Sequence, residues 1–424
     1  MKKEKMKEIN EVKRMKFTFL GGSDKIGSTA MLLESSESKF IFEYGITPSD
    51  PPGYPLEAPP VDYILLTHAH LDHSGLIPLL TRQYHAQFFT SQMTLMLSQI
   101  LLRDNIKICE LEGYPLMYSK ADIRNMDENL HQTEMDSKFN LKNHKLLVHS
   151  AGHIPGATMF ELRLENGLKL LFTGDINTID TRLVNGTTGK KCDILIMEAT
   201  YAGRNHKLRQ KIEYEFIEKI NDVISRGGKV IIPAFAVGRT QEILLILADL
   251  DFDIWLDGLG IEVTKLFLKE PRFIKDEKKL RKVYENVNKV RTKARRKKAL
   301  AGDIILTTSG MLDGGPVLRY IKEFNGNSKN ALLLTGYQVE GSNGRLLLDK
   351  KVININGEIE KINLDVEYYD FSAHAGHDEL IRFAQKCNPE HIILFHGENR
   401  ELLEKELSRK FEVHLPTNNM SVEF

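Results

Sequence analysis

Cysteine is scarce in this sequence: its 424 residues include only three, Cys109, Cys192 and Cys387, and no Cys-x-x-Cys pair. This scarcity excludes a disulfide framework and a zinc site built from thiolates, and it is typical of a cytoplasmic protein. An excess of charge of one sign is also lacking, because 58 Lys and Arg balance 58 Asp and Glu. The chain is therefore not a uniformly basic nucleic-acid binder, although it can carry a local basic patch.

Long apolar runs are missing as well. No stretch approaches the roughly 18 apolar residues of a membrane-spanning helix. The charged start, MKKEKMKEINEVKRMK, lacks the apolar core of a signal peptide. We expect a cytoplasmic location without membrane contact, and residues 1–15 as a charged extension.

Histidine, by contrast, is abundant and clustered: 14 are present. The stretch THAHLDH offers His68, His70, Asp72 and His73 directly after the predicted strand Tyr63–Leu66. Two histidines at alternate positions of a strand end can point the same way and bind one metal, and the following turn can address a second. Imidazole and carboxylate ligands favour Zn²⁺, with Mn²⁺ as an alternative.

Further polar residues have the same setting, just past a predicted apolar strand. They are His153, Asp175, His374 and His396. Any one of them alone is better explained as a structural residue, but four strand ends can converge on one edge of a sheet. The histidines without this setting are interpreted as structural or solvated: His85, His131, His144, His149, His206, His391 and His414.

The order of predicted elements indicates an α/β protein. Strands mixed with helices in the first half predict an α/β sandwich, and strand, glycine loop and helix repeat over 229–324 as in parallel βαβ units. Because the histidine clusters return near the end, we infer that a second domain is inserted into the first. The expected segments are 1–15, an extension; 16–203 and 370–424, the two parts of the first domain; and 204–369, the inserted domain.

Taken together, these motifs resemble the metallo-β-lactamase fold and, within it, the β-CASP branch of nucleic-acid-processing hydrolases. The HxHxDH stretch with His153 and Asp175 is similar to the former. Glu198 in MEATY, His374 in FSAHAGH and His396 in HGE are similar to the added motifs of the latter. PAFAVGRTQEIL, TSGMLDGGP and GYQVEGSNGR resemble the inserted domain. The resemblance implies an αββα sandwich with an inserted β-CASP α/β domain.

The resemblance also implies a role for each matching residue. The implied metal ligands are His68, His70 and His153 for one ion, Asp72, His73 and His396 for the other, and Asp175 between them. His374, oriented by Glu198, would protonate the leaving oxygen, and Asp72 would share in catalysis. One position departs from the family, because Glu43 in FIFEYGI stands where an aspartate that supports the ligands is usual.

Such a site suits hydrolysis of phosphodiester bonds by two zinc ions, which activate water and neutralise charge on the phosphoryl oxygens. An imidazole titrates near neutral pH and can protonate the leaving 3′-oxygen. Histidine at position 396 resembles the RNA-processing members, archaeal RNase J and the endonuclease subunit of the 3′-end cleavage factor. We therefore expect a zinc-dependent ribonuclease that degrades single-stranded RNA from a 5′-monophosphate in the 5′→3′ direction. An RNA endonuclease is the alternative; a small-ester hydrolase, a DNA nuclease and a non-catalytic scaffold are less favoured.

Two features predict RNA contacts outside the metal cluster. Residues 269–298 carry 14 Lys and Arg against four acids, which predicts a stripe for a phosphate backbone, with a solvated helix face as the alternative. Ser309 and Gly310, which follow the predicted strand Ile304–Thr307, and Arg345 in the next glycine loop could hold a phosphate. Tight turns required for packing are the alternative for both loops. A homodimer is compatible with the sequence.

Overall fold

The computed structural model describes residues 15–49, 51–355 and 357–424. The chain forms two compact units. The first comprises Met1–Ile179, Gly186–Asn205 and His374–Phe424, and the second comprises Asp180–Asn185 and His206–Ala373. Residues 1–14 of the expected extension lie outside the described residues. Met15 is buried and exchanges backbone hydrogen bonds with Phe424.

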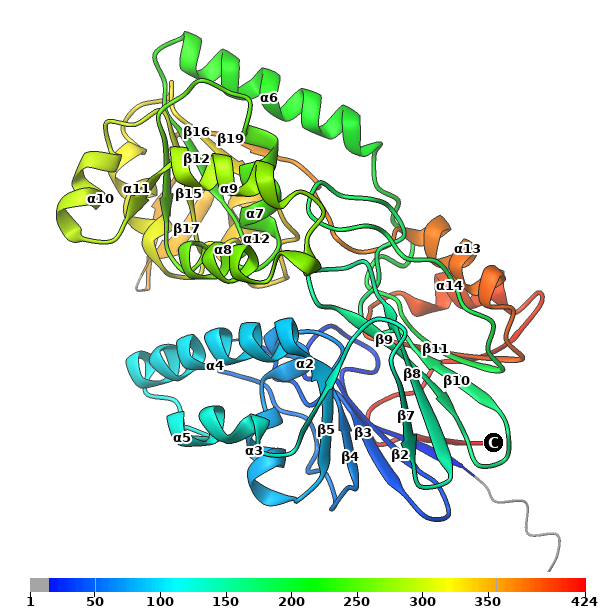
Figure 1. The fold of residues 1–424 in the computed structure, drawn as a ribbon. Helices are drawn as coiled ribbons and strands as arrows, with labels where there is room; N and C mark the ends of the chain where they lie inside the picture. Colours follow the sequence, from blue (N-terminus) through cyan, green and yellow to red (C-terminus); the bar gives the residue numbers. More distant parts are fainter. Residues whose placement is uncertain (1–14, 50, 356) are drawn as a thin grey trace, which may run out of the picture. The chain divides into compact units, whose positions relative to one another are not determined.

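Two seven-stranded sheets form the centre of the first unit (Figure 1). In spatial order, the first sheet contains β22 (Ser421–Glu423), β1 (Lys16–Gly21), β2 (Ala30–Glu34), β3 (Lys39–Phe42), β4 (Tyr63–Leu65), β5 (Gln87–Ser91) and β6 (Leu130–Thr133). The second contains β21 (Glu412–His414), β20 (His391–Phe395), β11 (Ile194–Glu198), β10 (Lys169–Phe172), β9 (Thr158–Arg163), β8 (His144–Ser150) and β7 (Lys138–Leu141).

Helices cover the outer face of each sheet (Figure 1). The helices beside the first sheet are α2 (Leu71–Ser74), α3 (Ile77–Gln83), α4 (Gln92–Glu112), α5 (Lys120–Arg124) and the 3₁₀ turn η1 (Asn125–Asp127). Those beside the second are α13 (His377–Cys387) and α14 (Arg400–Leu407). The sandwich therefore has the predicted αββα layers.

Alternation along the strands produces these layers. In β3, Phe40 and Phe42 belong to the apolar cluster between the sheets, whereas Ile41 belongs to the cluster under the helices. Successive strand residues point to opposite faces, so a strand that is apolar at every position is buried on both. Leu95 and Leu102 of α4 close the outer cluster from the helix side.

The second unit is built on a parallel six-stranded sheet. In spatial order its strands are β14 (Asn288–Val290), β13 (Ile254–Asp257), β15 (Ile304–Thr307), β12 (Val230–Pro233), β16 (Ala331–Leu334) and β19 (Asp365–Tyr368), beside the hairpin of β17 (Val352–Ile355) and β18 (Glu358–Lys361). Its helices are α6 (Arg209–Ser225), α7 (Arg239–Leu247), α8 (Gly260–Lys269), α9 (Glu277–Asn286), α10 (Lys293–Ala299), α11 (Pro316–Phe324) and α12 (Asn343–Lys350), with the 3₁₀ turn η2 (Pro271–Phe273). The predicted parallel βαβ architecture of an inserted α/β domain is confirmed.

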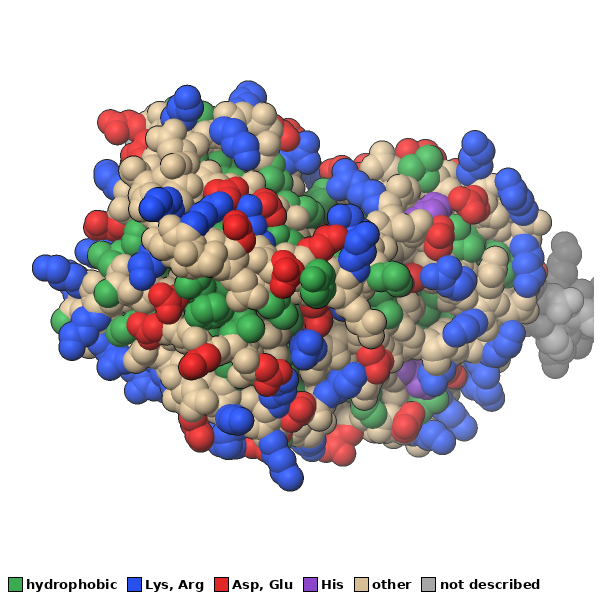
Figure 2. Space-filling view, turned by 90° about the horizontal axis from the view of Figure 1, so that it is seen from above, with side chains coloured by type: hydrophobic (Ala, Val, Ile, Leu, Met, Phe, Trp, Pro, Cys, Tyr) green, Lys and Arg blue, Asp and Glu red, His purple; other side chains and the backbone are tan. Residues whose placement is uncertain are grey.

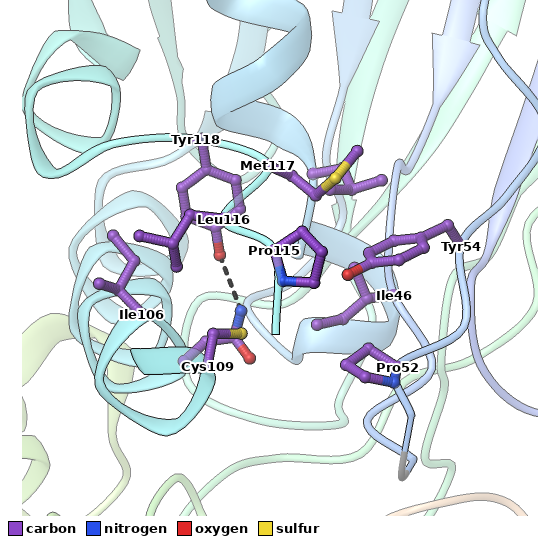
Figure 3. A pocket seen from close by; sticks show the side chains of 11 residues that line it. Ile46, Pro52, Tyr54, Ile106, Cys109, Pro115, Leu116, Met117 and Tyr118 are labelled. Carbon is purple, nitrogen blue, oxygen red and sulfur yellow. Dashed lines mark hydrogen bonds between the residues drawn. The ribbon is translucent and has the colours of Figure 1, made fainter. Parts of the chain in front are cut away.

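An apolar pocket in the first unit is too small for a substrate. Ile46, Tyr54, Ile106 and Met117 are among the side chains that line it (Figure 3). It encloses about 10 Å³, roughly the room for one water molecule. The substrate site must therefore lie elsewhere.

Two further expectations from composition can be compared with the structure. Cys109, Cys192 and Cys387 are all buried and free. Among the described residues, no helix has both the length and the apolar character needed to cross a bilayer.

Candidate metal centre

The turn after β4 brings two predicted ligands into place through a close approach of two backbones. A Cβ on Gly45 would lie 1.8 Å from the carbonyl oxygen of Asp72, so only glycine fits here. Beside it, the amide of Tyr44 donates to the carbonyl of His73 over 2.8 Å. The segment that follows β3 thus fixes the α2 turn and the Asp72 and His73 side chains that it carries.

The remaining polar residues come from strand ends, as the sequence predicted. Strands β10, β11 and β20 are parallel neighbours, so their carboxyl ends lie at the same edge of the second sheet. Asp175 follows β10, Glu198 ends β11 and His396 follows β20, while His153 lies in the loop between β8 and β9. His374 opens the last segment of the first unit.

One group of possible metal ligands consists of His68, His70, His153 and Asp175. Nδ1 of His70 lies 3.2 Å from Nε2 of His68 and 3.2 Å from Nε2 of His153. Oδ2 of Asp175 lies 3.4 Å from Nε2 of His68 and 3.8 Å from Nε2 of His153. These distances suit ligand atoms on one small cation, because tetrahedral zinc bonds of 2.0–2.2 Å separate neighbouring ligands by roughly 3.3–3.6 Å.

A second group consists of Asp72, His73 and His396. Oδ2 of Asp72 lies 3.8 Å from Nε2 of His73 and 3.6 Å from Nε2 of His396. Asp175 reaches this group too: its Oδ2 lies 3.5 Å from Nε2 of His73, and its Oδ1 lies 3.7 Å from Nε2 of His396. A single carboxylate therefore lies between both groups.

Buried atoms without hydrogen bonds support a role for this cluster in holding metal. Among the described residues, neither ring nitrogen of His73 has a hydrogen-bond partner, nor does Oδ1 of Asp175. Both side chains are almost fully buried. An unsatisfied buried polar group is costly, and a bound cation would satisfy these atoms. The residues thus fit the divalent cations that the sequence implied.

The charges of the cluster are strongly coupled. Burial lowers the pKa of His73, but the carboxylates of Asp175 and Asp72 more than offset this and raise it to about 10. Burial lowers the pKa of His70 to about 4, although the carboxylates oppose it. Burial would raise the pKa of Asp175, but His73 and His396 hold it well below its usual range. A metal must displace the proton of His73 to bind there, so occupancy depends on pH.

His374 and Glu198 form a separate pair beside the cluster. Nδ1 of His374 lies 3.1 Å from both carboxylate oxygens of Glu198, and its Nε2 lies 3.8 Å from Oδ2 of Asp175. Glu198 also accepts the amide of Ile176 over 2.7 Å. Burial lowers the pKa of His374, but Glu198 and then Asp175 raise it to about 9. The His374 side chain is 19% exposed, so it is accessible from solvent beside the cluster.

Three supporting residues hold the histidines in position, and two of them carry no signal in the sequence. Oε1 of Glu43 accepts the amide of Thr67 over 3.0 Å, and its Oε2 lies 3.8 Å from Nδ1 of His73. The hydroxyl of Thr29 lies 2.7 Å from Nδ1 of His396. Such a contact holds a proton on Nδ1 and leaves Nε2 to point into the cluster. Glu43 was noted in the sequence, whereas Thr29 and Thr67 were missed.

The predicted substrate residues Ser309, Gly310 and Arg345 belong to the second unit. Nε of Arg345 lies 2.8 Å from Oδ2 of Asp349, so a carboxylate already balances part of its charge. Their role stays a prediction.

Three stretches of the chain match known families. Residues 45–215 match the beta-lactamase superfamily domain, residues 240–347 the Beta-Casp domain, and residues 359–416 the Zn-dependent metallo-hydrolase RNA specificity domain. These matches confirm the resemblance and the fold class inferred from the motifs.

Whole-chain comparisons agree. The chain is 40% identical over 399 residues to the probable RNase MJ4 of Methanocaldococcus jannaschii, with 91% of this chain and 93% of that protein covered. It is 31% identical over 390 residues to the RNase aCSPSF2 of Saccharolobus solfataricus, with 89% and 78% covered. It is 31% identical over 449 residues to the transcription termination factor FttA of Thermococcus kodakarensis, with 94% and 69% covered.

A solved structure from Enterococcus faecalis V583, described as a protein of unknown function, has a TM-score of 0.61 at 13% identity and covers 97% of this chain and 100% of that one. At this identity the likeness supports the fold alone. The identity to the archaeal proteins carries the assignment, since it extends over nearly the whole chain. The protein belongs to the metallo-β-lactamase, β-CASP family of zinc-dependent ribonucleases.

Proposed function

We propose that the two groups of the metal centre each hold one zinc ion and that Asp175 bridges the two ions. The other ligands are His68, His70 and His153 for the first ion and Asp72, His73 and His396 for the second. Mn²⁺ suits the same nitrogen and oxygen ligands. When bound, the ions supply Lewis-acid activation of water and neutralise charge on the phosphodiester.

The observation that carries the mechanism is the His374–Glu198 pair. Glu198 accepts the Nδ1 proton of His374 and so directs the Nε2 proton towards the cluster. We assign His374 as the general acid that protonates the leaving 3′-oxygen, because its raised pKa keeps it protonated near neutral pH. Glu198 is the positioning residue that fixes its tautomer and charge.

We propose that the two glycine loops predicted to bind phosphate, those of Gly310 and Arg345, act together as one RNA-binding loop. The side chain of Gln338 donates to the carbonyl of Gly310 over 3.0 Å, and the amide of Gly344 donates to the carbonyl of Met311 over 2.8 Å. The two glycine loops that the sequence suggested therefore lie against each other within the second unit. We assign Ser309 and Gly310 as its phosphate contacts, with Arg345 as a weaker one.

Within the predicted basic stripe, residues 269–298, carboxylates already pair with some of the basic side chains, so fewer of them are available to RNA than the charge count indicates. Arg296 forms an ion pair with the buried Asp257, with Nε 2.6 Å from Oδ2, and Lys279 pairs with Asp249. The exposed basic residues of α10 for which no ion pair is found in the described part of the chain are Lys293, Arg295, Lys297 and Lys298. Figure 2 shows Lys and Arg on many other parts of the surface as well. Sequence-independent backbone binding by α10 is thus one contribution among several.

We propose 5′→3′ degradation of single-stranded RNA that carries a 5′-monophosphate, because a single phosphate-binding loop suits a terminal phosphate. Endonucleolytic cleavage is the second candidate, favoured by the similarity to a protein named as a transcription termination factor, since termination acts on a growing RNA away from its 5′ end.

A comparison of linear and circular RNA of one sequence separates the two. Linear RNA with a 5′-monophosphate should release mononucleotides from its 5′ end, RNA with a 5′-hydroxyl should react more slowly, and the circle should survive. The His374→Ala protein serves as the control for contaminating nucleases. Rapid cutting of the circle by the wild-type protein alone would replace the exonuclease proposal with the endonuclease one.

A further inference from the structure

Three more side chains with metal-ligating atoms meet at the opposite end of β20. His391 opens this strand, and Glu412 and His414 lie in the edge strand β21. The two strands are parallel, with His391 opposite Glu412 and Ile393 opposite His414. Residues two apart in a strand share a face. Pairing therefore places all three side chains on one face, although His391 lies 21 residues before Glu412 and 23 residues before His414 in the sequence.

The three side chains are spaced as ligands of one ion are. Nδ1 of His391 lies 3.4 Å from Oε2 of Glu412 and 3.4 Å from Nε2 of His414. Nε2 of His414 lies 3.6 Å from Oε1 of Glu412. Neighbouring ligands of tetrahedral zinc are separated by roughly 3.3–3.6 Å. The spacing also matches that between His68, His70 and Asp175 in the metal centre.

Hydrogen bonding alone explains this triangle poorly. The two contacts to Glu412, at 3.4 and 3.6 Å, exceed the usual range of about 2.7–3.2 Å for a nitrogen donor and an oxygen acceptor, and the two rings share a long nitrogen–nitrogen hydrogen bond of 3.4 Å. Glu412 supplies the negative charge that a dication requires.

The surroundings hold both imidazole rings but leave a coordination position open to water. The ring of Phe424 lies 4.5 Å from that of His391 and 5.5 Å from that of His414, centroid to centroid. Backbone hydrogen bonds to Met15 fix Phe424 in turn. The histidine side chains are 21% and 22% exposed, and that of Glu412 is 64% exposed. An ion here could thus exchange with solvent.

This cluster is separate from the metal centre. His391 begins β20 and His396 follows its end, and five residues of strand span about 17 Å. An ion bound by His391, Glu412 and His414 therefore cannot contact the ligands around Asp175.

We propose that His391, Glu412 and His414 bind a divalent transition-metal ion, preferably zinc, at a solvent-accessible site that links the edge strand β21 to β20. The ion adds ligand bonds to the three backbone pairings that join the edge strand β21 to β20. Because it binds the folded protein, it stabilises the fold and not the reaction. This inference is independent of the proposed direction of RNA cleavage.

Zinc binding to the full-length protein tests the proposal. The wild-type, Glu412→Gln and His414→Ala proteins are dialysed against the same low concentration of free zinc and their metal content is measured. The wild type should retain one more equivalent than either variant, and added zinc should raise its melting temperature more. His85→Ala, which removes an exposed histidine elsewhere in the same unit, is the matched control and should behave as the wild type.

Glu412→Gln protects the test against misfolding, because it keeps the size of an exposed side chain. The loss of a ligand should weaken zinc binding at this site by at least the 10–100-fold typical of changes around a metal, while RNA cleavage stays within about twofold. Equal metal content in the wild type and both variants would overturn the site. A loss of cleavage in Glu412→Gln would overturn its separation from the metal centre.

Discussion

The two ends of β20 place the same kinds of side chain in opposite settings. Past its carboxyl end, His396 joins a cluster in which His68 and His73 are completely buried. At its amino end, His391 joins a cluster that is partly open to solvent. Buried polar atoms without partners are costly, so bound cations would stabilise the first cluster, whereas water can satisfy the second. Ligands of the same types can thus form a site that a bound cation must stabilise or a site that water can also fill, and the burial of the ligands decides between the two.

The two clusters also differ in how many elements form them. The metal centre draws on the turn after β4, the helix α2, the loop after β8, and the ends of β10 and β20. The other cluster needs only two neighbouring strands. A change in the metal centre should therefore affect chemistry strongly, and a change in the other cluster should affect mainly stability.

The largest effect is expected from Asp175→Ala. This carboxylate lies within 3.8 Å of His68, His73 and His153, so its removal deprives both proposed ions of a ligand. Cleavage should fall by about 10³-fold or more, and bound zinc should decrease. Asp136→Ala, at an exposed aspartate about 4.0 Å from His149, is the matched control. Wild-type turnover with full zinc content in Asp175→Ala would show that the centre has been assigned wrongly.

A smaller effect, without metal loss, is expected from His374→Ala. A general acid contributes about 10²–10⁴-fold, and zinc content should hardly change. The pKa of His374 is raised to about 9, so the ring holds its proton at pH 7 and loses it as the pH rises. Wild-type activity should therefore fall on the alkaline side, below pH 9 because bound cations repel the proton, and the variant should lack this decline.

Glu198→Gln sharpens the same test. It keeps a hydrogen-bond acceptor for His374 but removes the negative charge, the largest influence that raises the pKa of that ring. The alkaline decline should move to lower pH while zinc content stays constant. Loss of one zinc equivalent in His374→Ala would instead make this histidine a ligand.

The sequence identifies the residues that the structure brings together in the candidate metal centre, because each of them lies in a local pattern. HxHxDH is a single turn, and Asp175 and His396 directly follow strands that apolar patterns reveal. The sequence indicates only structural or solvated roles for His391 and His414 and gives no signal for Glu412, because their cluster depends on the register between two strands and no local motif encodes that register.

The basic stripe also shows that the sequence does not reveal contacts between distant residues. Counting charges over 269–298 includes Arg296, but its partner Asp257 lies far away in the sequence and is brought close only by the fold. Thr29, beside His396, is likewise a long-range neighbour without a sequence signal. Local pattern predicts ligands and strand ends, whereas partners across strands require the three-dimensional structure.

The smallest effect is expected at Glu43, a buried carboxylate that lies beside His73 in the metal centre. Among the described residues, no buried carboxylate is found in the same position beside His391. Burial raises the pKa of Glu43 to about 7, although His73 opposes the shift. Its negative charge therefore forms as the pH rises towards 7, and it favours a cation bound at His73. Glu43→Gln keeps the length and the contact with Thr67 but removes that charge. Zinc affinity should fall by about 10-fold, in the range typical of residues that support metal ligands, and its increase with pH should become shallower.

Saturating zinc should restore most of the cleavage in Glu43→Gln, because the proposed ligands and His374 remain. Glu161→Gln, which alters a carboxylate–histidine pair formed with His149 at 3.0 Å on the second sheet, is the matched control. Titration of zinc at several pH values measures both affinities. An unchanged affinity would mean that Glu43 serves the fold alone, through the amide of Thr67. The contrast between the two ends of β20 would then rest on burial of the ligands themselves.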